Sequence, residues 1–460
     1  MNFTVDSSRL SFVNLRSWFG VAILFLFIAV LGSLVYFDDL QIVGRGETEL
    51  PTIYNVRVLG IKILDAVSIL LTCLLALYLI VRERILITPF HKSIGVIFLV
   101  YCYAGLVGFI YSFFLGYDYL IWLQDFQQTL YMTAFFLFTF HFLDSWRKWK
   151  IFVVCLLVFF ALKNVLITYK TLTGIGKAIG DWAFRASSNA EFAYFPMMFF
   201  PFIILILKSR SRILKVFLLL LSFIYLFNSL LGIYRTVWVM LILGSFYLLT
   251  QLDRKSRLKL VIWSTVGLGS CLLVVATLYP RFLALAWNYK FASIFIWSIS
   301  GDRSNATRSL EIINVTDYVL RHFAFLQGMG LGAWWDDSAR RLLPDAGSGF
   351  MYKMRFHTTH LLVLSQFLKL GIVAMFFYWS SIYKVFKIVA DYVRTISWDR
   401  WEKSVVLGLN IGLLCAFISS ADYVRLFTMI GVNIGITASF ISLDRKEWKG
   451  GREIFTGTAL

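Results

Sequence analysis

Long apolar runs recur along the whole chain, and clusters of lysine and arginine lie between alternate runs. About 20 consecutive apolar residues are enough for a helix to cross the hydrocarbon core of a bilayer. Apolar residues make up 59% of the 460 residues and charged residues only 15%, against about a quarter in soluble domains. The pattern predicts an all-α fold of the polytopic integral membrane class and excludes a soluble globular protein.

The basic clusters predict the orientation of the chain. If each apolar run crosses once, every cluster falls on the same side, which the positive-inside rule identifies as the cytoplasm. Both termini are then cytoplasmic, residues 1–460 form a single membrane domain, and the net charge of +18 needs no nucleic-acid partner. The first span lacks a small-residue cleavage site, so we expect it to be retained. The sequence predicts about 12 transmembrane helices, at residues 17–37, 58–81, 93–115, 119–143, 150–170, 190–207, 213–232, 234–252, 260–279, 358–386, 404–421 and 426–443.

Residues 280–357 form one large outer loop between the ninth and tenth predicted spans. Loops this long are usually functional in an otherwise compact protein. Basic residues outnumber acidic ones in this loop. One interpretation is that long loops are exempt from the positive-inside rule. The other is that the loop binds an anion, for which the planar fork of arginine is well suited.

Within the loop, Thr307–Phe325 is predicted to be an amphipathic helix capped by Asn305 or Thr307. Arg308 would lie in its first turn, where a cation opposes the helix dipole, and this favours a role in binding. The run Gly328–Gly332 lacks the context of a phosphate-binding motif and predicts a tight turn. The expected apolar stripe of the helix is Leu310, Ile313, Tyr318, Leu320 and Phe323.

Two histidines, His357 and His360, lie where the loop meets the tenth span. Their spacing allows a shared helix face, but no glutamate of a zinc-protease motif accompanies them, so no metal is predicted. A general base or an orienting donor fits better, and an interfacial histidine without chemistry is the alternative. The five cysteines all lie in predicted spans, where we expect small apolar side chains without a redox role.

Three further cations lie in or beside predicted spans. Arg235 opens the eighth span at its outer end, either as a phosphate ligand or as a snorkelling cation. Lys62 and Asp65 share a face of the second predicted span and either neutralise each other or serve a transport path. Lys163 in the fifth span raises the same transport alternative.

Three stretches of sequence occur in the order of a known family pattern. The first is Asn228–Thr236, which keeps an arginine, Arg235, opening a transmembrane helix. The second is the Arg308 helix followed by the glycines at 328–332, and the third runs from His360 to Gly371. In these stretches the chain resembles the O-antigen ligase and O-antigen polymerase superfamily of bacterial inner-membrane glycosyltransferases. It departs from the family pattern at Tyr234, Leu361 and Lys369, where serine, asparagine and an acidic residue are usual.

The resemblance implies a glycan donor carried on polyisoprenyl pyrophosphate at the periplasmic face, where the large loop would lie. Arg235 and Arg308 would bind the pyrophosphate and stabilise the charge on the leaving group. His360 would accept the proton of the acceptor hydroxyl, with His357 as the alternative. No metal and no other cofactor is implied. The further donor-binding candidates are Arg185, Arg303 and Arg321.

The function expected from this resemblance is polymerisation of the repeat units of a surface polysaccharide at the bacterial inner membrane. A ligase that moves the finished glycan onto lipid A core or another acceptor is the first alternative. A transporter or flippase of a lipid-linked glycan is the second, and an assembly protein without catalysis is the third. Besides donor, acceptor and membrane lipids, a flippase and a chain-length regulator are candidate partners.

Overall fold

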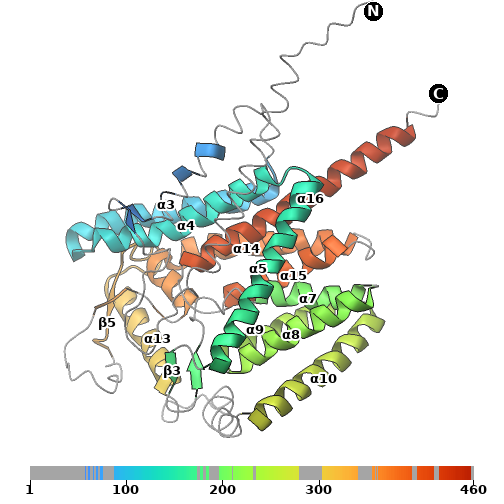
Figure 1. Ribbon diagram of the computed structural model, residues 1–460. Helices are drawn as coiled ribbons and strands as arrows, with labels where there is room; N and C mark the ends of the chain where they lie inside the picture. Colours follow the sequence, from blue (N-terminus) through green and yellow to red (C-terminus); the bar gives the residue numbers. More distant parts are fainter. Residues whose placement is uncertain are drawn as a thin grey trace, which may run out of the picture.

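The computed structural model of the chain is built almost entirely of helices (Figure 1). It describes residues 57–58, 61–62, 66, 69–70, 73–75, 87–173, 177–179, 183–185, 196–209, 211–231, 235–278, 303–339, 355–357, 359, 361–395, 401–418 and 424–456. The described helices are α3 Pro89–Leu115, α4 Tyr119–Phe142, α5 Trp146–Thr173, α7 Pro196–Lys208, α8 Arg212–Leu231, α9 Arg235–Gln251, α10 Arg254–Leu278, α13 Arg303–Arg321, α14 Leu362–Thr395, α15 Trp401–Ile418 and α16 Val424–Thr456.

Several of these helices are suited to a membrane. Six of the described helices are long and apolar enough to cross a bilayer, and they include most of α3, α5, α8, α10, α14 and part of α16. Two shorter apolar stretches, Phe199–Lys208 and Trp238–Gln251, belong to α7 and α9. A described helix overlaps each span predicted from 93 onward, but α10 begins at Arg254 instead of 260, and α14 and α16 continue to Thr395 and Thr456, beyond the predicted ends at 386 and 443. The helical class with several candidate membrane spans is confirmed, while the total of 12 spans stays a prediction.

The start of the second predicted span is wrong. Strands β1 Arg57–Val58 and β2 Ile61–Lys62 pair antiparallel, so residue 58 lies in a hairpin and not at the start of a helix. A short apolar run does not by itself distinguish a strand from a helix. Lys62 therefore shares no helix face with Asp65, which lies outside the described residues.

The helices pack most closely where glycine removes a side chain. A Cβ on Gly431 of α16 would lie 2.3 Å from the Met132 carbonyl oxygen of α4. A Cβ on Gly408 of α15 would lie 2.3 Å from the Pro201 nitrogen of α7. Small residues at such crossings are the usual means of close helix association in membranes, where burial of apolar surface drives little.

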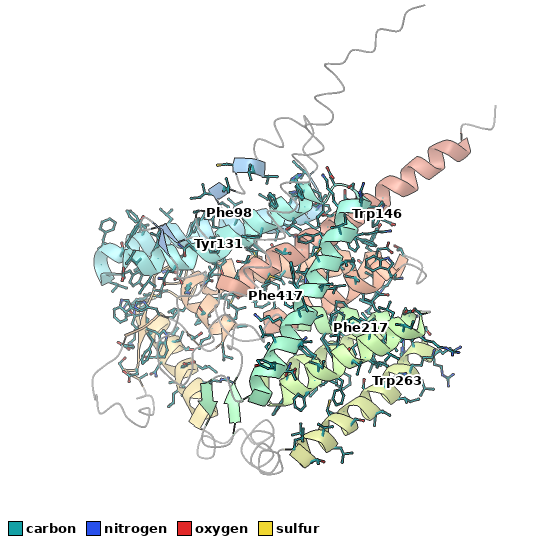
Figure 2. The ribbon with its side chains drawn as sticks, in the orientation of Figure 1. Phe98, Tyr131, Trp146, Phe217, Trp263 and Phe417 are labelled. Carbon is teal, nitrogen blue, oxygen red and sulfur yellow. The ribbon has the colours of Figure 1, made fainter. Side chains whose placement is uncertain are left out.

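Side chains divide the bundle into a packed interior and an apolar outer surface (Figure 2). Tyr131 and Phe417, both labelled there, are 1% and 3% exposed, whereas Phe217 on α8 and Trp263 on α10 are 55% and 49% exposed. Large apolar side chains facing outward are what a hydrocarbon solvent allows. In Figure 1, α10 lies at the outer edge of the bundle beside α8.

The loop helix exists, but its position and face differ from the prediction. It spans Arg303–Arg321, so the proposed caps Asn305 and Thr307 lie inside it and Arg308 lies in its second turn. The dipole argument for Arg308 therefore loses its force, since the effect is confined to the first turn. Of the predicted stripe only Tyr318 is buried, and Phe323 is 88% exposed.

The buried face of α13 is partly polar, which explains the error. It consists of Glu311, Asn314, Val315, Tyr318 and Val319 at helical spacing. A hydrophobic pattern cannot show a face whose first two members are a carboxylate and an amide. With Tyr117, Trp335 and Leu368, the apolar members of this face form a second, smaller core that joins the loop to α14.

Candidate functional site

The glycine turn, residues 328–332, follows α13 and lies between α3, α4 and α14. Its three glycines have φ angles of 75°, 81° and 78°, a left-handed conformation that favours glycine. The Met329 and Gly330 amides donate to the carbonyls of Leu368 and Lys369, at 2.8 and 3.0 Å. The turn predicted from the sequence is confirmed, and its amides bind the protein's own backbone instead of a phosphate.

Backbone contacts lock this turn in place. A Cβ on Gly330 would lie 2.0 Å from the Gly108 nitrogen in α3. Gly371 interrupts α14 with φ 65° and ψ 178°, and a Cβ there would lie 2.3 Å from the Gly328 nitrogen. The kink of α14 and the glycine turn therefore fit only because both carry glycine at the point of contact.

A buried ion pair fixes the same region from α4. The Lys369 ammonium lies 2.8 Å from the Asp125 carboxylate, and the two side chains are 4% and 8% exposed. The second oxygen of Asp125 accepts a hydrogen bond from the Gly332 amide at 2.8 Å. Asp125 thus ties α4, α14 and the glycine turn together. Lys369 occupies the position at which the family resemblance led us to expect an acidic residue.

A short hairpin brings the end of the loop back toward Asp125, Lys369 and the glycine turn. Strands β5 Trp335–Asp336 and β6 Arg355–Phe356 pair antiparallel, and the rings of Trp335 and Phe356 stack with centroids 4.7 Å apart. His357 follows directly and hydrogen-bonds the backbone of Ala333. Burial lowers the pKa of His357, and the nearby charge of Asp125 opposes this only in part. The imidazole is therefore mainly neutral near pH 7, as a proton acceptor requires.

The structure describes the side chains of only some of the predicted donor-binding arginines. Arg235 begins α9, Arg303 begins α13, and Arg185 ends strand β4 Ala183–Arg185, which pairs with β3 Lys177–Ile179. The side chains of these three arginines lie outside the described part of the structure, and so does His360. Arg308 is half-buried on α13.

Arg321 is already occupied by carboxylates. Its guanidinium lies 2.6 Å from Asp317 and 3.1 Å from Asp336. Hydrogen bonds from Ser338 and Arg321 lower the pKa of Asp336, although its partial burial opposes this shift. Arg308 lies 13 residues before Arg321, about 20 Å along the helix axis. The two arginines therefore cannot clamp one pyrophosphate from the same helix, and Arg321 is better explained as a support of the β5–β6 hairpin.

Asp125 and Gln366, two polar residues in the helices, were missed as site candidates. Gln366 lies in the second turn of α14 and is 2% exposed, and neither its amide nitrogen nor its amide oxygen has a hydrogen-bond partner among the described residues. Asn164, next to Lys163 on α5, is 1% exposed, and its side-chain nitrogen and oxygen likewise have no hydrogen-bond partner in the described part of the chain. The available signal was a polar residue inside an apolar run, which in membranes is a functional candidate.

Among the described residues, no three His, Cys, Asp or Glu side chains lie close enough together to hold a metal ion. The four cysteines whose side chains are described are free thiols. No protein-family model matches the chain, and no curated protein matches it. The arrangement therefore offers one chemical group, the neutral imidazole of His357. It lies shortly before α14 and near the glycine turn, which the Asp125–Lys369 pair holds in place.

Proposed function

We propose that this chain is a glycosyltransferase of the bacterial inner membrane that polymerises the repeat units of a surface polysaccharide from a polyisoprenyl-pyrophosphate donor. In this proposal about 12 helices cross the membrane, both termini are cytoplasmic, and the loop 280–357 is periplasmic. The donor lies with its pyrophosphate at the periplasmic surface, and the acceptor is the end of another glycan.

The observation that carries the proposal is the anchoring of His357. This histidine directly follows the β5–β6 hairpin, and α14 begins a few residues later, so these two elements support it. The tie between Asp125, Lys369 and Gly332 fixes both supports to the bundle. Such preorganisation of His357 favours a role in proton transfer, because this chemistry requires the acting group to be held in place.

The chemistry assigned to the site is a displacement at the sugar. His360, or His357 in its place, accepts the proton of the acceptor hydroxyl as that oxygen bonds to the anomeric carbon. The bond from this carbon to the pyrophosphate oxygen breaks, and the pyrophosphate lipid leaves with the electron pair. Arg235 and Arg308 stabilise the negative charge that develops on it. Arginine side chains supply the positive charge, so the proposal needs no metal.

A ligase shares this donor chemistry and differs only in its acceptor, so it stays the first alternative. A flippase of a lipid-linked glycan is favoured by one observation. Lys163 lies on α5 with 0% exposure beside Asn164, and buried ionisable residues within spans often mark transport paths. A flippase would depend on Lys163 and not on the histidines of the loop.

The test replaces Arg235, Arg308, His357 and His360 singly with alanine in the producing cell and scores the length ladder of the surface polysaccharide. Arg394→Ala is the matched control, because Arg394 is a 65% exposed arginine near the C-terminal end of α14. Loss of long chains with single repeats retained supports the polymerase. Accumulation of lipid-linked polymer supports the ligase. Normal ladders from all four variants refute the catalytic assignment.

A further inference from the structure

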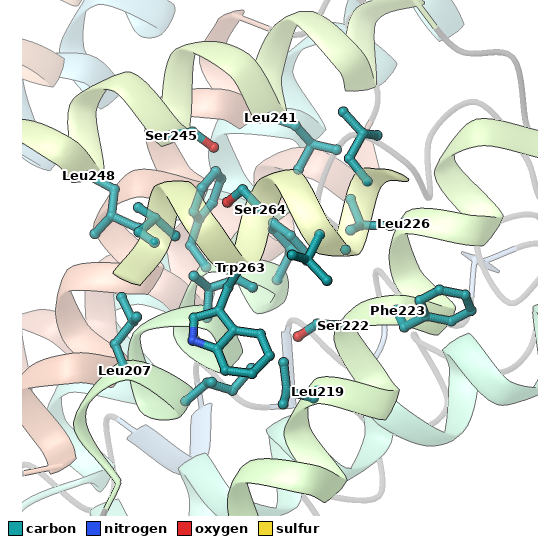
Figure 3. A pocket seen from close by; sticks show the side chains of 18 of the residues that line it. Leu207, Leu219, Ser222, Phe223, Leu226, Leu241, Ser245, Leu248, Trp263 and Ser264 are labelled. Carbon is teal, nitrogen blue, oxygen red and sulfur yellow. The ribbon is translucent and has the colours of Figure 1, made fainter. Parts of the chain in front are cut away.

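A large apolar cavity lies apart from the glycine turn, between α7, α8, α9 and α10. Its volume is ≈ 670 Å³, which is in the range of pockets that hold sizeable ligands. Figure 3 shows the Trp263 indole of α10 among the lining side chains, with Leu207 of α7 on one side and Leu219 of α8 on the other. The described lining is mostly aliphatic and aromatic, with some serine hydroxyls and no charged group, so it fits the hydrocarbon part of a ligand.

The cavity opens sideways because α10 packs loosely. Buried side chains on α10 are confined to Ser256, Leu260, Cys271 and Val275. Val266 and Phe246 line the cavity and are still 55% and 64% exposed. Exposed apolar lining on a helix suited to span a bilayer faces hydrocarbon, so a lipid chain can enter from the membrane without crossing water.

Basic residues surround one end of the cavity, where α7 ends and α8 and α10 begin. The Lys208 ammonium at the end of α7 lies 2.9 Å from the carboxylate of Asp253, which directly precedes α10, so these helix ends lie together. Asp253 is the only carboxylate within residues 208–215 and 250–260, so this end is strongly positive. Further cations in the first two turns of α8 and α10 are Arg212, Lys215, Arg254, Lys255, Arg257 and Lys259.

Some of these cations lie one helical turn from side chains that line the cavity. Lys215 is four residues before Leu219 on α8, and Lys259 is four residues before Trp263 on α10. Residues at this spacing share a helix face, and helical side chains lean toward the N-terminus, here toward the positive end. Apolar lining and cations therefore follow one another along the same faces, as hydrocarbon and phosphate follow one another in a phospholipid.

The cations also stand where helix stability disfavours them. The first turn of a helix carries partial positive charge, and neither α8 nor α10 has an acidic residue there. The positive-inside rule explains basic residues at one end of a bundle, but it does not require an apolar cavity beside them. An anion bound between the two helix starts would offset both the side-chain charges and the helix dipoles.

We infer that this cavity holds an acyl chain of an anionic diacyl phospholipid, whose phosphate lies among the basic residues at the starts of α8 and α10. The open side admits the chain from the bilayer, the uncharged lining fits hydrocarbon, and the cations match the headgroup. A zwitterionic phospholipid fits less well, because its own cation would lie among these lysines and arginines. The inference does not depend on the proposed function, since neither Arg235 nor the histidines take part in it.

Two glycines of α10 provide a matched pair of variants. A Cβ on Gly267 would meet only Leu226 Cδ1, at 4.0 Å across the cavity, so Gly267→Leu fills the cavity. Gly269 is exposed, is not part of the lining and has nothing within 4 Å of its Cβ position. Gly269→Leu therefore gives the same gain in helix propensity without touching the cavity. Ser264→Phe, from the preceding turn of the lining, is a second filling variant that replaces Gly267→Leu if that chain does not fold.

A second pair of variants removes charge instead of filling space. Arg212→Gln/Lys215→Gln removes two cations, three residues apart, from the start of α8. Lys384→Gln/Lys387→Gln removes two exposed cations with the same spacing from α14, which contributes no residue to the described lining. Both double variants lower the net charge equally, so an effect confined to the first one identifies the site.

The experiment uses the full chain in nanodiscs that contain equal amounts of dioleoyl phosphatidylglycerol and dioleoyl phosphatidylcholine, which differ only in headgroup. The chain is then extracted into detergent, and the lipid that it retains is quantified by mass spectrometry. The unchanged chain should retain phosphatidylglycerol at least about tenfold over phosphatidylcholine, which corresponds to about 1.4 kcal/mol. The filling variants should lower this retention at least about tenfold, and Arg212→Gln/Lys215→Gln should abolish the preference. Gly269→Leu and Lys384→Gln/Lys387→Gln should behave as the unchanged chain does.

Equal retention of phosphatidylglycerol by the filling variants and Gly269→Leu overturns the inference. Equal retention of the two lipids by the unchanged chain does so as well. An equal loss in both charge variants would reduce the headgroup effect to the net charge of the protein, against the inference. A polyprenyl monophosphate that displaces phosphatidylglycerol when added at one tenth of its concentration would assign the cavity to that lipid instead.

Discussion

The buried pair Asp125–Lys369 predicts that replacing both residues costs less unfolding free energy than replacing either one alone. Removing one partner of a buried ion pair leaves an uncompensated charge and typically costs about 3–5 kcal/mol. Lys369→Met leaves the Asp125 carboxylate without its cation. Asp125→Leu leaves the Lys369 ammonium buried without the Asp125 carboxylate and also leaves the Gly332 amide without its acceptor. Each single variant should therefore lose about 4 kcal/mol of unfolding free energy.

The double variant Asp125→Leu/Lys369→Met should be more stable than either single variant. It contains neither charge of this pair, and what remains is the unpaired Gly332 amide, a loss of about 1–3 kcal/mol. Independent effects of about 4 kcal/mol each would add to about 8 kcal/mol, so the expected coupling is about 6 kcal/mol.

The assay is denaturant unfolding of the purified chain in micelles, followed by tryptophan fluorescence. Trp122 is a local reporter, because its indole donates to the Gly105 carbonyl and its Cβ lies 3.0 Å from the Cβ position of Gly332. Arg394→Met is the control, since the Arg394–Asp391 pair is 65% and 57% exposed and should contribute less than about 1 kcal/mol. A double variant that loses as much as the sum of the two single variants would refute this account.

Three further predictions follow from single sites. Gly330→Ala should cost at least about 3 kcal/mol in the same unfolding assay, since its Cβ meets α3 backbone, and Gly95→Ala, whose Cβ meets nothing, should not destabilise. Asp253 caps α10 through the Ser256 amide, so Asp253→Ala should cost about 1 kcal/mol and Asp253→Asn less. A hydrogen bond from Lys208 holds the Asp253 pKa below its usual value, so this contribution, present above about pH 4, should fade as the pH falls further. The His357 pKa is lowered in the fold, so stability should decline below about pH 6.5, a slope that His357→Gln should reduce in a pH series of unfolding curves.

Apart from α13, the helices from α3 onward followed from the lengths of apolar runs, because a bilayer fixes how long such a run must be. Periodicity predicted the buried face less well. On α13 the sequence pattern favours Ile313 and Leu320 as core residues, yet they are 44% and 52% exposed, while Glu311 is 3% exposed. The buried face of α13 includes the polar residues Glu311 and Asn314, so hydropathy alone does not identify it.

The tie between α4 and α14 had no signal in either segment alone, since Asp125 and Lys369 lie 244 residues apart. Seen separately, Asp125 is a charged residue inside the fourth predicted span, and Lys369 stands where the family pattern places an acidic residue. Together they cancel each other's charge at a distance of 2.8 Å. If a carboxylate is needed beside the glycine turn, Asp125 of α4 supplies it here, and Lys369 holds it. The departure at Lys369 then speaks for the proposed function instead of against it. Exchange of the two charges in the double variant Asp125→Lys/Lys369→Asp tests this directly. Restored stability without restored polysaccharide ladders would show that the carboxylate must come from α4, whereas recovery of both would show that only the pairing matters.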